Sequence, residues 1–379
     1  MWTILWFLMV IVVFCLWAAP EYWGRKVYPH ITVAMESLDV FVDIGDPVTI
    51  RCKFSNPTRL PCPRVKLSMK LPEQIRSGRE EDGRDHVEVH FYLMPRQIAE
   101  VTFTVYAVRR GIAQWQEADL EFTDALGLRK EYRTVYVHAR AVVRPRRLQP
   151  VALPRTLTEL LGEIRTKRFY HEDPSLFVGV RPYQAGDPLR GIHWLATART
   201  GELMVKQFGH TTSSKVLILF NGQMFDLYWK TVYKHRLDAM CERLLQISAK
   251  LMENETSVGL LTNLHDSMAM SFHEPAASGP VQLARLANRM GSVSEHPRSS
   301  MADLIRSASR YAALGDTVLL LTSYWDTEAV RAANEWQRKY KNLIVYNMLW
   351  DDNKWNLPGV PAITENIAYS DAVDKEAAS

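Results

Sequence analysis

The sequence predicts a mixed α/β protein in which an apolar helix precedes an all-β domain and an α/β domain. Three observations support this prediction: an uncharged N-terminal run, period-two alternation between about 33 and 145, and alternating strands and helices between about 155 and 365. A chain of 379 residues is long enough for two or three domains of about 150 residues each.

The composition is that of an ordinary globular protein, with 47% hydrophobic and 23% charged residues. A formal net charge of +4, from 46 basic and 42 acidic residues, is too small to indicate nucleic-acid binding. Cys15, Cys52, Cys62 and Cys241 lack the paired spacing of a zinc site. We therefore expect free, buried thiols, with a Cys52–Cys62 bridge across a hairpin as the alternative.

The first segment predicts a single transmembrane helix over residues 2–23. Trp2–Ala19 carries no charge and spans about 27 Å as a helix, close to the roughly 30 Å of bilayer hydrocarbon. A cleaved signal peptide is the alternative, but a cut after this run places bulky Trp17 where a small residue is expected. Because Arg25 and Lys26 follow the span, we expect the chain beyond them to lie in the cytoplasm at the cell membrane.

Residues 30–143 predict an immunoglobulin-like β-sandwich. Segments that alternate apolar and polar residues indicate strands with one buried and one solvated face: Val48–Phe54, Val65–Leu71, Val87–Leu93 and Val101–Val105. Turn signals such as Asn56-Pro57 separate these segments, and several short strands at this spacing are typical of a sandwich. A basic, proline-rich linker over 144–155 follows.

Residues 156–368 predict a doubly wound α/β domain, and 369–379 a flexible tail. Short, nearly all-apolar segments are typical of strands buried on both faces: Lys215–Phe220, Ser257–Leu261, Thr317–Thr322 and Leu343–Met348. Helical segments alternate with them: 227–254, 281–290, 301–313 and 326–340. Such alternation predicts a parallel sheet covered by helices, in which ligands bind beyond the carboxyl ends of the strands.

The segment Arg181–Phe208 forms the most distinctive motif of the sequence. Asp187-Pro188 predicts the start of a helix with the carboxylate as N-cap, and Gly201 fits a left-handed C-terminal end. The candidate site residues belong to this motif: Arg181, Tyr183, Gly186, Asp187, Arg190, Trp194 and Arg199.

Two interpretations of this motif stay open. In the structural one, a cap and ion-pair network braces the entry to the α/β domain, with these members: Arg181, Asp187, Arg190 and Arg199. In the functional one, the motif binds an acidic partner, with Trp194 and Tyr183 as aromatic anchors. Catalysis by Asp187 and His193 is a third interpretation, for which we find no nucleophile.

The spacing R-x-Y-x-x-G-D-x-x-R-x-I-x-W-x-x-x-A-R resembles the signature of the family known as domain of unknown function 58. These residues meet it: Arg181, Tyr183, Gly186, Asp187, Arg190, Ile192, Trp194, Ala198 and Arg199. Val205-Lys206 and Phe208 continue the likeness, and upstream Arg110-Gly111 and Asp124–Leu128 resemble the end of that family's sandwich. The resemblance implies a transmembrane N-terminus, a β-sandwich and a von Willebrand factor A-like domain, often encoded beside a MoxR-type AAA+ ATPase.

The resemblance also raises the question of a metal site. Von Willebrand factor A-like domains commonly hold Mg²⁺ with an Asp-x-Ser-x-Ser run after the first buried strand. The matching positions here are Asn221, Gln223 and Phe225, which replace the carboxylate and both hydroxyls. Asp266 and Asp326 follow other strands, where carboxylates are usually solvated turn residues. We therefore predict no metal and no other cofactor.

We predict a membrane-anchored, non-enzymatic adaptor or scaffold, because the sequence has no phosphate loop, metalloprotease helix or nucleophile elbow. The expected partner is a cytoplasmic protein, bound through the A-like domain, and the family resemblance implies a MoxR-type AAA+ ATPase. Two alternatives remain: a metal-dependent adhesion or binding receptor, and a hydrolase that uses residues 181–208.

Overall fold

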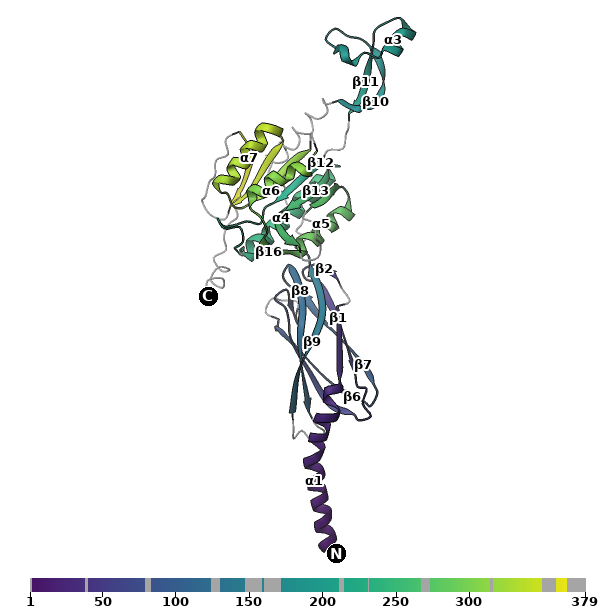
Figure 1. Ribbon diagram of the computed structural model, residues 1–379, viewed down its shortest axis with the longest axis vertical. Helices are drawn as coiled ribbons and strands as arrows, with labels where there is room; N and C mark the ends of the chain where they lie inside the picture. The colour runs from purple at the N-terminus through teal and green to yellow at the C-terminus, as the bar shows by residue number, and fades with distance from the viewer. Residues whose placement is uncertain are drawn as a thin grey trace. The chain divides into compact units, whose positions relative to one another are not determined.

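The computed structural model describes residues 2–37, 40–78, 83–123, 130–146, 159, 172–210, 215–230, 232–266, 273–313, 316–349 and 359–366 (Figure 1). The chain divides into two compact units, the first comprising 1–147 with 287–293 and the second 148–286 with 294–379. The tail over 369–379, the segment Asp124–Leu128 and most of the predicted linker lie outside the described residues.

The first helix, α1 (Trp2–Lys26), matches the helix predicted at the N-terminal end (Figure 1). Apolar side chains along it are exposed, among them Trp2, Phe7 and Trp17. Among the residues that the structure describes, no helix combines the length and hydropathy that a membrane crossing requires. The structure thus confirms a helix here, and the membrane span stays a prediction from the sequence.

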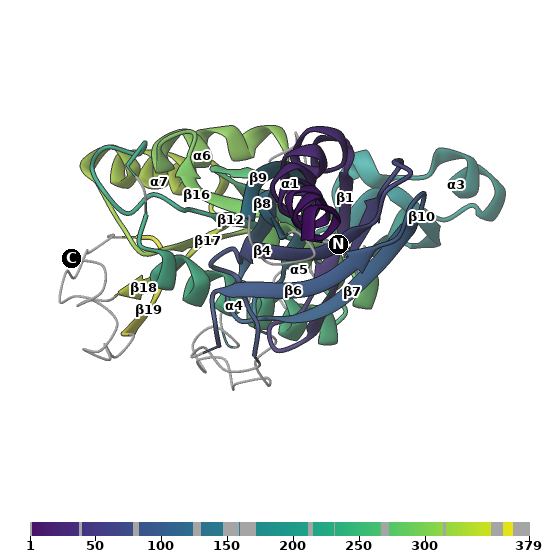
Figure 2. The same cartoon turned by 90° about the horizontal axis from the view of Figure 1, so that it is seen from below.

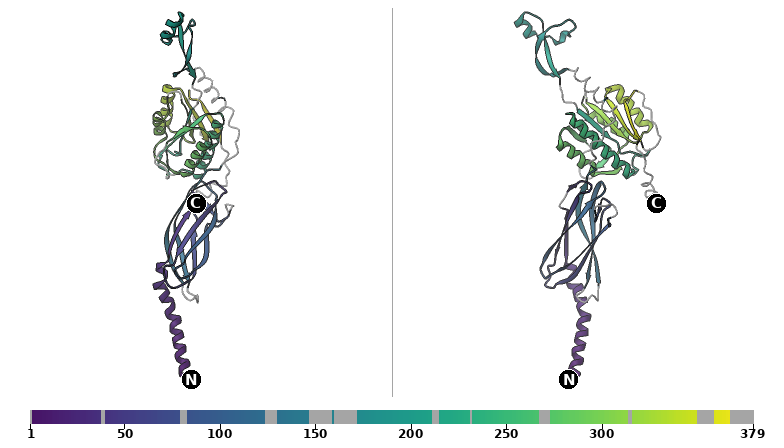
Figure 3. Two further views of the ribbon diagram at one scale, coloured as in Figure 1. Left: turned by 90° about the vertical axis from the view of Figure 1, so that its right-hand side faces the viewer. Right: turned by 180° about the vertical axis from the view of Figure 1, so that it is seen from behind.

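The predicted sandwich consists of two sheets. One has the order β1 (Thr32–Ser37), β3 (Pro47–Ser55), β7 (Ile98–Ala107), β5 (Ile75–Arg76). The other has the order β2 (Phe41–Val42), β9 (Lys130–Val143), β8 (Gly111–Thr123), β4 (Cys62–Lys70), β6 (His86–Leu93). All neighbouring strands are antiparallel except β2 and β9. Figure 3 shows these strands, purple to blue, running lengthwise through the unit.

The sandwich core follows from the alternation in the sequence. In β3 every second side chain from Val48 to Phe54 is buried, and β4 repeats this pattern from Val65 to Met69. Cys52 and Cys62 are free, buried and on strands of different sheets, so the prediction of buried thiols is confirmed for these two residues and the alternative bridge is wrong. Burial raises the pKa of each thiol to about 12, which keeps both protonated and unreactive.

The second unit contains a sheet of the order β15 (His273–Ala277), β13 (Ser257–Thr262), β12 (Lys215–Phe220), β17 (Thr317–Thr322), β18 (Leu343–Leu349), β19 (Ala362–Asn366). Only β15 is antiparallel to its neighbour. The predicted parallel sheet is therefore confirmed. The strand β12 lies between β13 and β17. The next strand in the chain, β13, is therefore added on one side of β12, and the later strand β17 on the other side, as in doubly wound folds.

Helices cover both faces of this sheet: α4 (Lys234–Glu253), α5 (Pro280–Ser292), α6 (Met301–Ser307) with the 3₁₀ turn η3 (Ala308–Arg310), and α7 (Thr327–Tyr340). In Figure 2, α6 and α7 lie on one side of the strands and α4 on the other. Leu217, Leu219 and Leu320 form one core with α6 and α7. Two short strands, β14 (Leu264–Asp266) and β16 (Val293–Pro297), form a separate two-stranded sheet.

Two details of this region differ from the sequence prediction. The helix predicted from Leu227 begins at Lys234, because the aromatic segment before it forms a loop. The pattern also did not predict β15 and β19, whose short sequences lack a long apolar run.

The motif Arg181–Phe208 lies in a hairpin with a sheet of its own, β10 (Glu172–Pro182) and β11 (Met204–His210). The turn η2 (Leu189–Gly191) and helix α3 (Trp194–Thr200) connect the two strands, and α3 lies at the end of the hairpin away from its open side (Figure 1). We call residues 172–210 the arm.

Candidate functional site

The molecule has two candidate sites: the carboxyl end of the parallel sheet and the arm. In doubly wound sheets a ligand binds where the strand order reverses, here between β12 and β17. Asn221 follows β12, Asn263 follows β13, and Thr322 ends β17. All three side chains are buried. With Gln223, also buried, they form what we call the amide network.

Asn221 lies at the centre of this network, and its side chain is fully buried. Its Nδ2 donates to Thr322 Oγ1 at 2.9 Å and to the Gln223 carbonyl at 3.2 Å. Its Oδ1 accepts from Asn263 Nδ2 at 2.9 Å and from the Gln223 main-chain N–H at 3.0 Å. Two donors and two acceptor positions are thus all engaged, which is the full capacity of an amide side chain.

Gln223 connects the network to the beginnings of two helices. Its Oε1 accepts from the main-chain N–H of Met301, the first residue of α6, at 2.7 Å. Its Nε2 donates to the Phe225 carbonyl at 2.8 Å and more weakly to Asp326 Oδ2 at 3.4 Å. Asp326 is itself the N-cap of α7, where Oδ1 accepts from the Ala329 N–H at 2.7 Å. The network therefore fixes the loop after β12 to both helices.

The residues at this edge of the sheet do not fit a divalent cation. Mg²⁺ requires oxygen ligands, usually with one or two carboxylates, whereas the amides of Asn221 and Gln223 direct N–H groups into the network. Asp326 is engaged as a helix cap, and Asp226 accepts a hydrogen bond from the Tyr324 hydroxyl. Among the described residues, no three His, Cys, Asp or Glu side chains come together as ligands. The side chain of Asp266 lies outside the described set.

In the arm, Arg181 and Asp187 form a bidentate ion pair. Arg181 Nη1 lies 2.7 Å from Asp187 Oδ2, and Arg181 Nη2 lies 2.7 Å from Asp187 Oδ1. Asp187 Oδ2 also accepts from the Gln184 N–H at 2.9 Å, while the Asp187 N–H donates to the Gln184 carbonyl at 3.0 Å. The Arg181 guanidinium, helped by the Gln184 N–H, lowers the pKa of Asp187 below its usual range. Asp187 therefore closes a turn and fastens it to β10.

The predicted role of Asp187 as a helix N-cap is wrong. Pro188 precedes η2 without a side-chain cap, and the helix α3 begins later, at Trp194. Its N-cap is His193, whose Nδ1 accepts from the Ala196 N–H at 3.1 Å. Gly201, with φ +76°, ends the helix in the left-handed conformation as predicted. An aspartate before proline can either close a turn or cap a helix. Here it closes the turn, because Arg181 binds its carboxylate.

The arm has a very small core. Ile192 and Val205 are its buried apolar residues in the described part, and they lie opposite each other in an isolated bridge. Gly186, with φ +111°, occupies a backbone conformation that favours glycine. Tyr183 is half-buried and its N–H donates to the Leu203 carbonyl at 2.8 Å. These contacts fix the shape of the arm locally.

Most other apolar side chains of the arm are exposed, Trp194 to 69% and Leu189 to 70%. We call the exposed set the arm surface: Phe177, Val178, Val180, Leu189, Trp194, Leu195 and Leu203. Arg190 and Arg199 are exposed as well, and within the described residues neither makes an ion pair or a side-chain hydrogen bond. The predicted four-residue brace is thus reduced to the pair Arg181–Asp187. The sequence pattern did not indicate the cap at His193 or the exposure of three leucines.

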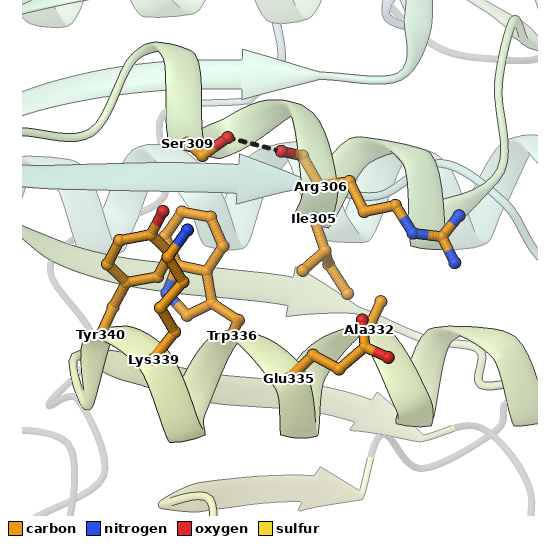
Figure 4. Close-up of a pocket in the computed structure, with 8 residues that line it drawn as sticks. All are labelled: Ile305, Arg306, Ser309, Ala332, Glu335, Trp336, Lys339 and Tyr340. Atoms are coloured by element: carbon orange, nitrogen blue, oxygen red, sulfur yellow. Dashed lines mark hydrogen bonds between the residues drawn. The ribbon is translucent and has the colours of Figure 1, made fainter.

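A shallow pocket between α6–η3 and α7 is shown in Figure 4. Its volume of about 200 Å³ is below the roughly 300–1,000 Å³ of small-molecule sites. Trp336 and Tyr340 line it with ring centroids 4.5 Å apart, and Lys339 Nζ lies 4.9 Å from the Tyr340 ring. Arg306 at its rim pairs with Glu328 at 3.1 Å. The pocket is a groove between packed helices, and two of its charged groups, those of Arg306 and Lys339, already interact with the protein.

Several solved structures are similar to about 30% of this chain. The CARDB domain of a Pyrococcus furiosus protein, solved in complex with di-metal ions, is 12% identical with a TM-score of 0.19 and covers 30% of this chain and 90% of its own. A non-cellulosomal cohesin from Archaeoglobus fulgidus is 10% identical with a TM-score of 0.20, covering 30% and 91%. A protein of unknown function from Porphyromonas gingivalis W83 is 17% identical with a TM-score of 0.20, covering 30% and 48%.

Among curated proteins no sequence matches this chain. The family model described as "Protein of unknown function DUF58" matches residues 179–361, a range that includes the whole motif, the amide network and the parallel strands β12, β13, β17 and β18. Residues 179–361, just under half of the chain, are therefore a segment of the DUF58 family.

Proposed function

We propose that this protein is a non-enzymatic, membrane-tethered docking protein whose arm binds a cytoplasmic protein partner. The observation that carries the proposal is the arm surface, in which Trp194 and several leucines are exposed on a frame fixed by the Arg181–Asp187 pair. Tryptophan and arginine dominate the binding energy of interfaces, and Trp194, Arg190 and Arg199 are all exposed on the arm. The partner that the family resemblance implies is a MoxR-type AAA+ ATPase.

We assign the α/β domain to the von Willebrand factor A-like fold and the sandwich to the immunoglobulin-like class. The strand order β15-β13-β12-β17-β18-β19, with its one antiparallel edge strand and helices on both faces, supports the first assignment. The two facing, mostly antiparallel sheets support the second. In this proposal the A-like domain has lost its metal and serves as the support of the arm.

The membrane tether rests on the uncharged run Trp2–Ala19 and is supported by the exposed apolar side chains of α1. Arg25 and Lys26 directly after this run support a cytoplasmic position for the domains. Reporter fusions at the C-terminal end test this orientation. Activity of an export-dependent reporter, without activity of a cytoplasmic one, would refute it.

Purification of the full chain from its own cells in detergent tests the docking proposal, with the MoxR-type ATPase quantified by mass spectrometry. Trp194→Ser should lower its recovery by about tenfold or more, since central tryptophans often contribute 2 kcal/mol or more to binding. Trp229→Ser is the matched control, because Trp229 is also exposed but lies in the loop before α4. Equal recovery with both variants would refute docking through the arm.

Neither alternative function is favoured by a specific observation. A metal-dependent receptor requires anionic ligands where the amide network directs N–H groups. A hydrolase built on the motif requires a free base, whereas His193 Nδ1 caps α3 and Asp187 is paired with Arg181.

A further inference from the structure

Between residues 177 and 208 the described charged side chains of the arm carry a net positive charge, whereas Glu172 and Asp173 stand at the start of β10. Asp187 is neutralised by its ion pair with Arg181. The remaining charged residues with described side chains are all exposed: Arg190, Arg199, Glu202 and Lys206. Three cations therefore accompany one carboxylate among the apolar side chains of the arm surface.

We propose that the segment of the partner that contacts the arm surface is acidic and carries apolar side chains of its own. This inference rests on the proposed function and specifies the chemistry of the partner. Acidic groups pair with Arg190 and Arg199, while apolar groups cover Trp194 and Leu195. Such charge complementarity steers association and selects the partner, and burial of the apolar side chains supplies affinity.

An anionic membrane surface is the competing occupant of a basic, apolar element. Membrane-binding elements concentrate Lys and Arg around a continuous apolar face. On the arm, Glu202 and the exposed amide Gln207 lie among the apolar residues, and arginines outnumber lysine. Tryptophan and arginine are the residues enriched at protein interfaces. The composition of the arm therefore favours a protein segment.

The test is a photoreactive residue at position 195, where Leu195 is 62% exposed, in the full chain in its own cells. Cross-linked products are mapped by mass spectrometry, with position 136 in strand β9 as control, because Tyr136 is 76% exposed. The expected product joins residue 195 to a protein segment with more Asp and Glu than Lys and Arg. Its yield should fall about tenfold in the double variant Arg190→Gln, Arg199→Gln.

The matched control variant is Arg331→Gln, Arg338→Gln, which removes two exposed arginines from α7 and should keep the wild-type yield. A neutral or basic segment, or a wild-type yield in the arm variant, would overturn the acidic partner and leave docking intact. Cross-linking into lipid would overturn the inference in favour of a membrane surface. No protein product above the position-136 control would overturn both this inference and the proposed function.

Discussion

The amide network and the arm surface differ in which side chains they bury: the network buries polar side chains, and the arm surface exposes apolar ones. In the network, polar side chains are buried and every hydrogen-bonding position of Asn221 is engaged. In the arm, apolar side chains are exposed, and only Ile192 and Val205 are buried apolar residues in its described part. Buried, saturated polar groups stabilise a fold, whereas exposed apolar groups on a fixed frame are available to a partner.

In the proposed function, the partner therefore binds at a place that the fold class alone would not suggest. Doubly wound sheets bind ligands at the switch point, but here the switch point is closed by the protein's own amides. The loop after β12 is tied by Gln223 to α6 and by the Asp326 contact to α7. The arm instead keeps Trp194 and Leu189 in solvent. Substitutions in the two regions should therefore have different consequences.

The largest effect is expected for Asn221→Asp. The carboxylate cannot donate to Thr322 Oγ1 or to the Gln223 carbonyl, and it places an unpaired charge in a buried network. We expect the free energy of unfolding, measured by denaturant titration at pH 7 with chelator, to fall by about 3–5 kcal/mol. Asn254→Asp, the same change at an exposed residue after α4, should cost at most about 1 kcal/mol. Equal losses would mean that the network is not structurally important.

A smaller, local effect is expected for Asp187→Ala. Loss of the carboxylate releases Arg181 and the Gln184 N–H, so hydrogen exchange of the Gln184 amide should accelerate while the sheet β12–β19 keeps its protection. Because the pKa of Asp187 is lowered, its contribution is present above the ordinary value near 3.8 and is lost only as pH falls through the lower folded value. In the unsubstituted protein the Gln184 amide should therefore stay protected while other carboxyls begin to protonate. Unchanged exchange in Asp187→Ala would show that the pair does not hold the turn.

Almost no change in stability is expected for Arg199→Ala. Its predicted place in a brace is not supported, since the side chain is exposed in the last turn of α3. The free energy of unfolding, obtained from the denaturation midpoint, should change by no more than about 0.5 kcal/mol. Recovery of the partner should fall. A loss of stability as large as that of Asn221→Asp would restore the structural interpretation of the whole motif.

No effect is expected from divalent metal. A cation present at 100 times its Kd and bound only to the folded state would add about 2.7 kcal/mol. Thermal melts of the chain in millimolar Mg²⁺ or Mn²⁺ and in chelator should therefore coincide. An upward shift of several degrees that disappears in Asp326→Ala would show that the edge of the sheet binds metal despite its amides.

Much of the architecture is local and could be predicted from the sequence. The alternation from Val48 to Phe54 predicted β3, and the apolar runs Lys215–Phe220 and Thr317–Thr322 predicted β12 and β17, because burial on one or both faces leaves a direct pattern in the residues. Among the strands that were not predicted, β15 and β19 are edge strands whose pairing depends on a neighbour more than on their own residues.

The sequence by itself determined that an amide residue, Asn221, follows the first buried strand and that Arg181, Asp187 and Trp194 belong to one motif. Only the tertiary structure decided that Asn221 meets Asn263 and Thr322, because strand order brings together residues far apart in the chain. It also decided that Asp187 binds Arg181 rather than capping a helix. A short carboxylate before proline is compatible with both local structures, and a contact between separate elements selects one of them.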